Sequence, residues 1–591
     1  MRRTQFTFLA LLALSGMLAG CGRGFAIGSQ SSKSSQGSGS GQPTQGSGSG
    51  STSGSGSGSG SGTPTGPTAY SGVQMVTWHD DNARTGLNSN ETTLTPSNVN
   101  ASTFGKLFSY DVDGHIYAQP LYLSNVPIGA TLHNVVYVAT EYDSVYAFDA
   151  DNAGDGSPLW KTSLLRTGET PFQAGNPKPW IGITSTPVID VTSKTMWVVS
   201  EHKGGIIRLN SLNIETGAIQ GSVNISASVP STLPEAVNGQ LQLTSACLQR
   251  AGLLLTGGTV YIGFGGCPHG WLLAYDAATL KQTAVFCSSP NQDGYGPYPG
   301  GGGIWGGGAG PASDDQGNIF VTTGDGPNDD QTEWGESVLR LDTTLRVRDY
   351  FTPDDWSFLQ CKDSDLGSAG AMLAPGRDQV VAGGKNGLFF VLNQNSLGQK
   401  SVNNSGVLSS TWYGNSTYPS TCTTNTGQLV TAPVGGFRVY GTAAWFNGSI
   451  YVGGDPGPVK QYELQSDGSL KLVSEGPTSF ALNGMGATAA ISSNGTSNGI
   501  VWAIDHLAPV QVSGGGAAKP AVLHAYDAND LSHELYNSAQ NPADAAGLGV
   551  KFTVPTVANG KVFVGGAKDD YTVPNPQGEL DVYGLLPQPR S

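Results

Sequence analysis

Charged side chains are scarce in this chain. Asp, Glu, Lys and Arg make up 12% of its 591 residues, about half their usual share in soluble domains. Glycine is abundant instead, with 86 residues, and the excess of acidic over basic side chains gives a net charge of −15. This charge argues against nucleic acid or an anionic membrane surface as a partner. The composition is typical of an exported, turn-rich β protein with a neutral polar surface.

Cysteine is also rare, and its spacing excludes several kinds of site. There is no CxxC pair, no CxxCH haem motif, no Cys/His zinc spacing and no HExxH motif. In an exported protein we expect one or two disulfides. Five cysteines follow Cys21, so at least one thiol should stay free, and the sequence does not give the pairing. The five are Cys247, Cys267, Cys287, Cys361 and Cys422.

Long apolar runs are absent except at the N-terminus. Arg2 and Arg3 precede the run FTFLALLAL, and Leu18 to Cys21 read as a bacterial lipobox, LAGC. Residues 1–20 are therefore predicted to be a lipoprotein signal peptide, with Cys21 lipid-modified after cleavage. The alternative is a generic signal peptide with an incidental cysteine. We expect a chain that is exported and anchored to a bacterial membrane by lipid alone, either periplasmic or at the cell surface.

A low-complexity segment follows the lipobox. Residues 21–67 consist largely of Gly, Ser and Thr, which cannot bury enough apolar surface to fold. We expect a flexible tether that carries a folded body at residues 68–591. No later segment is apolar enough, for long enough, to cross a bilayer.

Internal repeats give the strongest indication of the fold. A run of alternating apolar residues, followed by a second run that often ends near AYD, recurs eight times at a mean spacing of about 60 residues. Alternation marks strands, and helical periodicity is almost absent. Such repeats predict an all-β fold, an eight-bladed β-propeller of four-stranded blades. The runs begin near residues 135, 195, 259, 318, 379, 449, 499 and 561.

These repeats resemble those of the pyrroloquinoline quinone (PQQ) dehydrogenases, which are eight-bladed quinoprotein propellers. The opening WHDDNARTGLNSNETTLTPSNVN at residues 78–100 and the closing KFTVPTVANGKVFVGG at 551–566 are similar to those of the family as well. The resemblance covers nearly the whole chain after the tether. It implies oxidation of an alcohol or a sugar with PQQ and Ca²⁺.

The stretch GGGGIWGGG, at residues 300–308, matches a family segment whose tryptophan forms the floor beneath the quinone. By this resemblance Trp305 is a cofactor-binding residue, and a flat cofactor gains stacking energy on an indole face. Glycines around that face let the backbone approach a rigid ring. A phosphate-binding loop is excluded, because no GK[ST] follows. The alternative is a core tryptophan in a glycine-rich loop between blades.

Other site residues follow from the same resemblance. Asp325 in NIFVTTGDG stands where the family has a calcium ligand, and Asp365 in DSDLGSAG stands at the catalytic base, which is also a metal ligand. Lys385 and Asn386 in GGKNGLFFVL match the residues that contact the quinone, and the lysine also serves in catalysis. A carboxylate that accepts the hydroxyl proton, together with cations that stabilise charge on the quinone oxygens, suits alcohol oxidation. The alternatives are turn aspartates and a solvated loop lysine.

Several family features are missing. Tyr117 in YAQPLY replaces a glutamate that touches the cofactor, and YIGFGGCPHGW lacks an acidic metal ligand. No two cysteines are adjacent, and WIGITSTPVID lacks the arginine that pairs with a PQQ carboxylate. Arg250 and Arg438 are the candidate substitutes. With Lys385 as the one cation, affinity for a tricarboxylate should fall.

Two classes of function therefore stand side by side. The first is a quinoprotein-type dehydrogenase that passes electrons to a separate acceptor protein, because the chain has no haem motif. The second is a non-catalytic propeller that binds an envelope protein or a glycan as a scaffold. We expect a monomer in either class. Cations that line the central funnel beside Lys385 would favour the first class, and a neutral funnel would favour the second.

Overall fold

Each sequence repeat forms the two middle strands of one blade. The structure is a computed structural model that describes residues 68–590, apart from 174–179, 245–246, 267, 293–300, 415–416, 425–427, 482–483, 508–517, 571–572 and 574. The first repeat forms β5 (Thr131–Ala139) and β6 (Ser144–Asp149), which pair in antiparallel register. Their valines and aromatic residues suit a buried pleated sheet. The predicted signal peptide, Cys21 and the tether lie outside the described residues.

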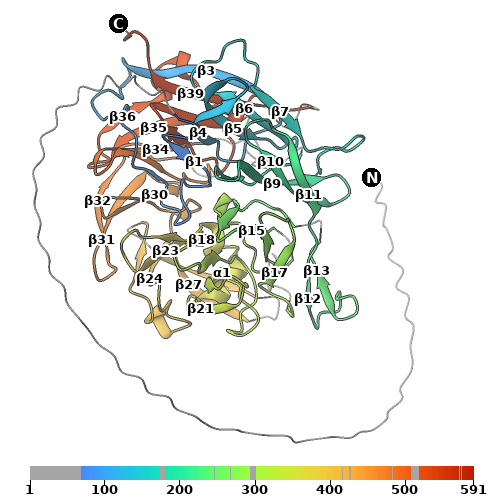
Figure 1. Cartoon of the computed structure of the whole chain (residues 1–591). Coiled ribbons are helices and arrows are strands. Elements are labelled where there is room, and N and C mark those ends of the chain that lie inside the picture. Colours follow the sequence, from blue (N-terminus) through green and yellow to red (C-terminus); the bar gives the residue numbers. More distant parts are fainter. Residues whose placement is uncertain are drawn as a thin grey trace, which may run out of the picture. The chain divides into compact units, whose positions relative to one another are not determined.

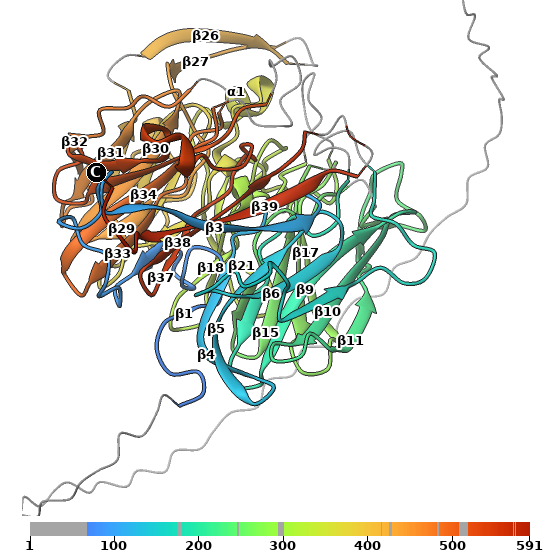
Figure 2. The same ribbon diagram turned by 90° about the horizontal axis from the view of Figure 1, so that it is seen from above.

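The described residues form eight antiparallel blades (Figures 1 and 2), so the predicted eight-bladed propeller is confirmed. The first four blades are β4 (Leu121–Ile128), β5, β6 and β7 (Trp160–Ser163), with β1 (Gln74–Met75) at the edge; β8 (Val188–Asp190), β9 (Thr195–His202), β10 (Ile206–Asn213) and β11 (Ile219–Asn224); β14 (Leu254–Thr256), β15 (Thr259–Phe264), β16 (Trp271–Asp276) and β17 (Gln282–Cys287); and β18 (Ala312–Ser313), β19 (Ile319–Thr322), β20 (Val338–Leu341) and β21 (Val347–Phe351).

The remaining four blades follow the same pattern. They are β22 (Met372–Leu373), β23 (Gln379–Gly383), β24 (Leu388–Asn393) and β25 (Ser409–Trp412); β28 (Arg438–Val439) and β29 (Ala444–Phe446), which both pair with β30 (Ser449–Asp455), then β31 (Val459–Leu464) and β32 (Leu470–Glu475); β33 (Ala490–Asn494), β34 (Ser497–Asp505), β35 (Val522–Asp527) and β36 (Glu534–Asn537), with β2 (Leu87–Asn88) at the edge; and β37 (Thr556–Ala558), β38 (Lys561–Ala567), β39 (Gln577–Leu585) and β3 (Phe104–Asp113).

The last blade joins both ends of the chain and closes the ring. Strand β3, from the N-terminal side, pairs with β39 from Phe104 opposite Leu585 to Asp113 opposite Gln577. Across this seam the Lys106 Nζ atom lies 2.5 Å from Oδ1 of Asp581 and 2.9 Å from Oε1 of Glu579. Closure removes the free sheet edges that an open array of blades would expose.

The hydrophobic core is divided among the blade interfaces. Among the described residues, eight large buried clusters each lie between two neighbouring blades and together follow the whole ring. Between the second and third blades, for example, Trp197 and Leu209 pack with Val260 and Trp271. Apolar contact on both faces of each sheet explains why the central strands are buried along their length.

Shorter elements decorate the propeller. Two hairpins, β12 (Ser228–Pro230) with β13 (Gln240–Gln242) and β26 (Thr417–Thr423) with β27 (Leu429–Gly435), lie outside the blades. The second hairpin is the insertion that blurs the repeat spacing between the fifth and sixth blades. The helical elements are α1 (Trp356–Lys362), η1 (Gly306–Gly308), η2 (Leu366–Ser368), η3 (Val402–Asn404), η4 (Ser538–Gln540) and η5 (Pro542–Asp544). No helix among the described residues is long and apolar enough to cross a membrane.

The described cysteines include both disulfide-bonded residues and a free thiol. Cys361 in α1 and Cys422 in β26 form a disulfide, which ties the hairpin β26–β27 to the helix. Cys247 is disulfide-bonded too, and Cys287 is a buried free thiol. Cys267 lies outside the described residues. A free thiol was expected from the odd count.

Candidate functional site

A cavity of about 650 Å³ collects side chains from several blades. Trp305, Asp325, Asp365 and Lys385, four residues predicted from the sequence, all line it. Asn386 is not among the lining residues. Its side-chain oxygen accepts a hydrogen bond from the Leu388 N–H over 3.1 Å and so shapes the turn that holds Lys385. The structure thus brings four of the five predicted cavity residues together.

Trp305 is held by a strap of backbone between the third and fourth blades. Next to it, the Ile304 N–H donates to the carbonyl of Phe264 over 2.9 Å, and the Gly302 N–H donates to the carbonyl of Asp325. The Gly324 N–H donates to the carbonyl of Gly303 on the same strap over 2.9 Å. Hydrogen bonds on both sides fix the position from which the indole enters the cavity.

The glycines around Trp305 serve the packing of backbone against backbone. Gly307 has a φ of +61°, and a Cβ atom there would lie 2.6 Å from the carbonyl oxygen of Tyr440. At Gly301 an added Cβ would lie 1.5 Å from the carbonyl oxygen of Pro268. Side chains at these positions would push neighbouring loops apart. The sequence had predicted glycines for the approach of a cofactor, but the contacts of these two are with the protein's own chain. Gly300 lies outside the described residues.

Asp363, Asp365 and Lys385 form the charged side of the cavity. Helix α1 ends at Lys362, and the next residue, Asp363, is its C-cap and has a left-handed backbone conformation with a φ of +52°. Two residues later, Asp365 Oδ1 lies 2.7 Å from Lys385 Nζ, and Asp365 Oδ2 accepts a hydrogen bond of 3.0 Å from the Trp305 Nε1–H. Lys385 also contacts Asp363 Oδ1 and lies 5.3 Å from the centroid of the Trp305 ring. Lys385 is thus an ion-paired lysine with only 12% of its side chain exposed.

Three carboxylates converge at this side. Ligand atoms of Asp325, Asp363 and Asp365 lie within 4.8 Å of one another, the spacing of a possible metal site. Behind them, the buried Glu336 accepts a 2.7 Å hydrogen bond from the Leu366 N–H. One oxygen of Asp325 and one of Glu336 are buried without a hydrogen-bond partner. No sequence motif marked Glu336, whereas Asp363 stands in the same DSD triplet as Asp365.

The charges of these acids differ. Burial, together with the neighbouring Asp365 charge, raises the pKa of Asp325 well above its usual value and that of Glu336 to about 8. Burial also opposes ionisation of Asp365, but the Lys385 ammonium outweighs it and holds the Asp365 pKa below its ordinary value. At neutral pH, Asp365 is therefore ionised, whereas burial favours the protonated forms of Asp325 and Glu336.

The cavity lining includes two further cations. Arg250 and Lys551 both line the cavity and are each only 7% exposed. The Arg250 Cζ atom lies 5.2 Å and the Lys551 Nζ atom 5.7 Å from the centroid of the Phe552 ring. Arg438, the second candidate substitute from the sequence, does not line the cavity and lies 3.4 Å from Asp455. The expectation of a single cation was therefore wrong, because Lys551 comes from the closing segment that had been considered for its fold alone.

Strained backbone surrounds the cavity. Non-glycine residues with positive φ include Glu336 at +53°, Asp363 at +52°, Met485 at +68° and Phe552 at +69°. Asp363, Met485 and Phe552 line the cavity, and Glu336 lies directly behind it. Such conformations are unfavourable for residues with a side chain and gather at sites where function requires them. Non-glycine residues with positive φ occur elsewhere in the described chain too, so the charged lining and not the backbone marks this cavity as the candidate site.

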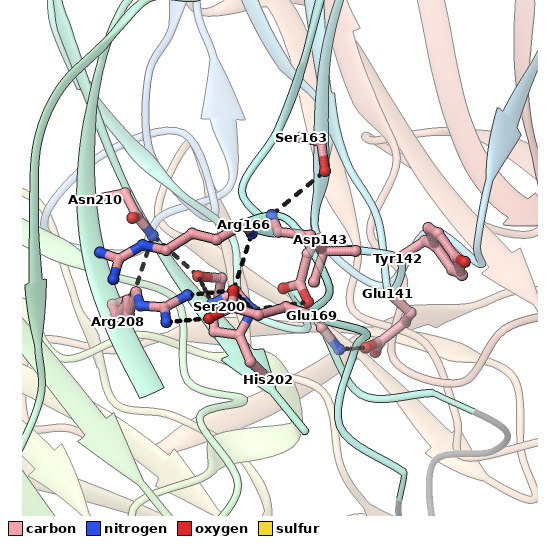
Figure 3. A network of polar contacts seen from close by, with 12 residues as sticks. Glu141, Tyr142, Asp143, Ser163, Arg166, Glu169, Ser200, His202, Arg208 and Asn210 are labelled. Carbon is pink, nitrogen blue, oxygen red and sulfur yellow. Dashed lines mark hydrogen bonds and ion pairs between the residues drawn. The ribbon is translucent and has the colours of Figure 1, made fainter. Parts of the chain in front are cut away.

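A second polar network lies in the first two blades (Figure 3). Ser200 Oγ lies 2.8 Å from His202 Nε2, and His202 Nδ1 lies 3.5 Å from Oδ2 of Asp143. This order resembles a hydrolase triad, but all three side chains are 0% exposed and none lines the central cavity. Arg208 pairs with Glu169 at the edge of the network. We assign the network a structural role in joining the two blades.

Comparison with known proteins yields structural neighbours alone. No family model and no curated protein matches the chain. Its fold is similar to that of quinohemoprotein alcohol dehydrogenase from Comamonas testosteroni, with 16% identity, coverage of 88% of this chain and 82% of that one, and a TM-score of 0.55. A quinohemoprotein alcohol dehydrogenase from Pseudomonas putida HK5 has 14% identity and a TM-score of 0.53, with coverage of 88% of this chain and 82% of that one. A europium-containing methanol dehydrogenase has 14% identity and a TM-score of 0.53, with coverage of 87% of this chain and 98% of that one. The chain thus has the eight-bladed β-propeller fold of the quinoprotein alcohol and methanol dehydrogenases.

Proposed function

We propose that this protein is a PQQ-dependent dehydrogenase that oxidises an alcohol or a sugar with the help of a bound hard cation. The observation that carries the proposal is the meeting of Trp305, the three clustered carboxylates and Lys385 in one cavity of about 650 Å³. A non-catalytic scaffold has no need for ionised and protonated carboxyls buried together behind an indole, since buried charge is costly. The charged lining therefore favours the enzyme over the scaffold.

The side chains present suit proton removal from an alcohol. Asp365 is ionised and is held in place by the Trp305 N–H and by Lys385, so one carboxylate is fixed where a substrate hydroxyl can give up its proton. Lys385, close to the indole ring, stabilises negative charge that develops above that ring. A quinone, when bound, supplies the two-electron acceptor. Because the sequence has no CxxCH motif, electrons pass onward to a separate acceptor protein.

The acid cluster fits a hard cation. Asp325, Asp363 and Asp365 offer carboxylate oxygens, the ligands preferred by Ca²⁺, and their ligand atoms lie within 4.8 Å of one another. A europium-containing methanol dehydrogenase has a similar fold. Three carboxyl groups at one point also suit a trivalent ion, because binding of a cation favours their ionised forms and so offsets the effect of burial on Asp325. We therefore propose Ca²⁺ or a lanthanide ion for this position.

Tryptophan fluorescence tests the cofactor. We expect saturable quenching by micromolar PQQ in the presence of Ca²⁺, lost in Trp305→Ala and kept in Trp412→Phe, whose indole lies on β25 outside the cavity. Binding that is absent up to millimolar PQQ would reject the quinone and leave the scaffold, with an envelope protein or a glycan as partner. An alcohol and sugar screen with an artificial electron acceptor then identifies the substrate.

Terbium luminescence tests the metal separately. Tb³⁺ bound beside Trp305 should be sensitised by the indole, and Asp365→Asn should weaken its binding at least tenfold, because a charged ligand is lost. Asp467→Asn changes an exposed turn aspartate and serves as the control. Equal terbium binding by both variants would place the ion elsewhere.

We also propose that the protein is exported and anchored through a lipid on Cys21, as the lipobox predicts. The chain should fractionate with membranes and incorporate labelled palmitate. Cys21→Ser should abolish the label and release the protein into the soluble fraction. A label that persists in Cys21→Ser would contradict the lipobox.

A further inference from the structure

The residues that directly follow β1 reach every blade of the propeller. Between Val76 and Asn88, a stretch we call the axial segment, the chain makes hydrogen bonds with all eight blades, each time at or just before a strand that begins the blade. So short a segment reaches all the blades only because it lies at the axis of the ring. Its partners, in blade order, are Gln119, Ile189, Leu255, Ser313, Leu373, Trp445, Ile491 and Val557.

Arg84 is the buried cation of the axial segment. It is 0% exposed, and burial lowers its pKa only to about 10, so it stays charged at neutral pH. All its hydrogen bonds go to uncharged oxygens. Those within the axial segment go to the Thr77 hydroxyl at 2.8 Å and to the carbonyls of Trp78 at 2.8 Å and Asp81 at 3.2 Å. The remaining donors reach two other segments of the chain.

One of these segments is the strap that carries Trp305, residues 301–311. Nε and Nη2 of Arg84 both donate to the carbonyl of Pro311, over 2.9 and 2.7 Å. The preceding residue, Gly310, leaves room for this contact, since an added Cβ would lie 2.8 Å from Arg84 Nη2. Two charge-assisted hydrogen bonds to one oxygen fix this end of the strap.

The other segment leads into the third blade and supports the strap from outside. Nη2 of Arg84 donates to the carbonyl of Leu253 over 3.2 Å. Next to it, the Gly252 N–H donates to the carbonyl of Gly308 over 3.0 Å, and the Gly308 N–H donates to the carbonyl of Trp305 over 2.9 Å. Arg84 is therefore bonded both to the strap and to the backbone that supports the strap.

We infer that Arg84 is a positioning residue for Trp305, because it fixes the strap and so sets the place of the indole in the cavity. The inference rests on the proposed function only where it takes that indole as the cofactor floor. A planar guanidinium donates to carbonyls in several directions, whereas a lysine offers a single nitrogen. Arg84→Lys should therefore keep the charge and lose the geometry.

The position of Trp305 can be followed without a cofactor. In the full-length chain labelled with 5-fluorotryptophan, the ¹⁹F signal that disappears in Trp305→Phe belongs to this residue. We expect Arg84→Lys to shift that signal. It should also weaken PQQ binding, measured by quenching of tryptophan fluorescence in the unlabelled chain, roughly 10- to 100-fold, the usual cost of a displaced binding group.

Asn88→Ala is the matched control. It removes another buried hydrogen bond of the axial segment, from Asn88 Nδ2 to the carbonyl of Val557 over 2.9 Å, but Val557 lies on the eighth blade and not on the strap. We expect this variant to unfold at a lower temperature and to leave both the ¹⁹F signal of Trp305 and PQQ affinity unchanged.

The inference is overturned if Arg84→Lys leaves the ¹⁹F signal of Trp305 in place. It is also overturned if Asn88→Ala shifts the signal equally, because the axial segment would then act through overall stability alone. Should Arg84→Lys fail to fold, Thr77→Val decides: it removes one acceptor of the guanidinium, and we expect a smaller shift of the same signal, whose absence would reject the role. If PQQ does not bind to the wild type, the proposed function fails, and the ¹⁹F signal alone decides the role of Arg84.

Discussion

The indole of Trp305 and the carboxylate of Asp365 are joined by a 3.0 Å hydrogen bond between Nε1 and Oδ2. The two residues come from different blades and are 60 positions apart. The bond orients both the proposed cofactor floor and the proposed base, so a change in either side chain's position changes the other. Gly324 makes the bond possible. A Cβ at this residue would lie 2.8 Å from Asp365 Oδ2 and 3.2 Å from Trp305 Nε1.

Gly324→Ala should therefore disturb the site. The added methyl group must displace the Trp305–Asp365 pair, at a cost of roughly 1–3 kcal/mol in the free energy of unfolding. We expect a shifted tryptophan emission spectrum and PQQ affinity reduced at least tenfold. Gly436→Ala is the control, because nothing lies within 4 Å of a Cβ at that position. An unchanged emission spectrum in Gly324→Ala would show that the pair tolerates a side chain.

The ion pairs across the closing seam should differ in strength. Lys106→Met leaves Asp581, whose side chain is 1% exposed, without its cation, and the loss of one partner from a buried pair costs about 3–5 kcal/mol. Lys568→Met breaks the ion pair between Lys568, which directly follows β38, and Asp111 of β3, whose side chains are 41% and 59% exposed. We expect that change to cost about 1 kcal/mol or less. Urea denaturation measures the unfolding free energy of both variants. Equal losses would show that the Lys106–Asp581 pair stabilises the seam no more than the exposed pair does.

Some residues of the site stand in local sequence motifs and could be predicted, whereas others reach the cavity through contacts between segments far apart in the sequence. Trp305 and Lys385 stand in short glycine-rich or strand-turn motifs, so the sequence around each was enough to nominate them. Arg250, Glu336 and Lys551 stand in no such motif. Arg250 and Lys551 become neighbours of the site because the ring closes, which brings the segment before the third blade near the segment that leads into the eighth. Glu336 lies in the connection between β19 and β20 that also contains Asp325, and its N–H donates to the carbonyl of Gly324. The repeats predicted the ring, but repeat spacing contains no information on which side chains point to its axis.

The disulfide between Cys361 and Cys422 should stabilise the region that leads into the acid cluster. It closes a loop of 61 residues, for which chain entropy gives roughly 2–4 kcal/mol. Phe358 and Leu359 of α1 also pack on Ala432 and Val434 of β27. We expect the double variant Cys361→Ser/Cys422→Ser to unfold at a lower temperature and to exchange amide hydrogens faster, first in α1 and in the hairpin.

Cys287→Ser serves as its comparison, because this thiol is free. Its amide exchange in α1 should match that of the wild type. If amide exchange in the double variant rises equally across the whole propeller, the disulfide acts on global stability and not on the local stability of α1, the helix that Asp363 caps.

Lys551 should make stability depend on pH in a defined direction. Burial, reinforced by the charges of Arg250 and Lys385, lowers its pKa from 10.5 to about 7. Above about pH 10.5 the lysine is neutral in both the folded and the unfolded chain, and it costs nothing. As the pH falls from 10.5 to 7, the unfolded chain gains a proton that the folded chain does not hold, so stability falls. Below about pH 7 the full cost, on the order of a few kcal/mol, is present.

Lys551→Met should therefore be more stable than the wild type, by the largest margin at pH 6, and the two unfolding free energies should converge toward pH 10. Denaturant titrations of the ligand-free proteins at pH 6, 8 and 10 measure this. Lys561→Met, which removes a lysine from an ion pair outside the cavity, should show no such convergence. A Lys551→Met variant that is less stable than the wild type at pH 6 would mean that contacts of the ammonium with its surroundings outweigh the cost of its burial. A gain in stability at pH 6 would instead show that the buried ammonium destabilises the folded chain.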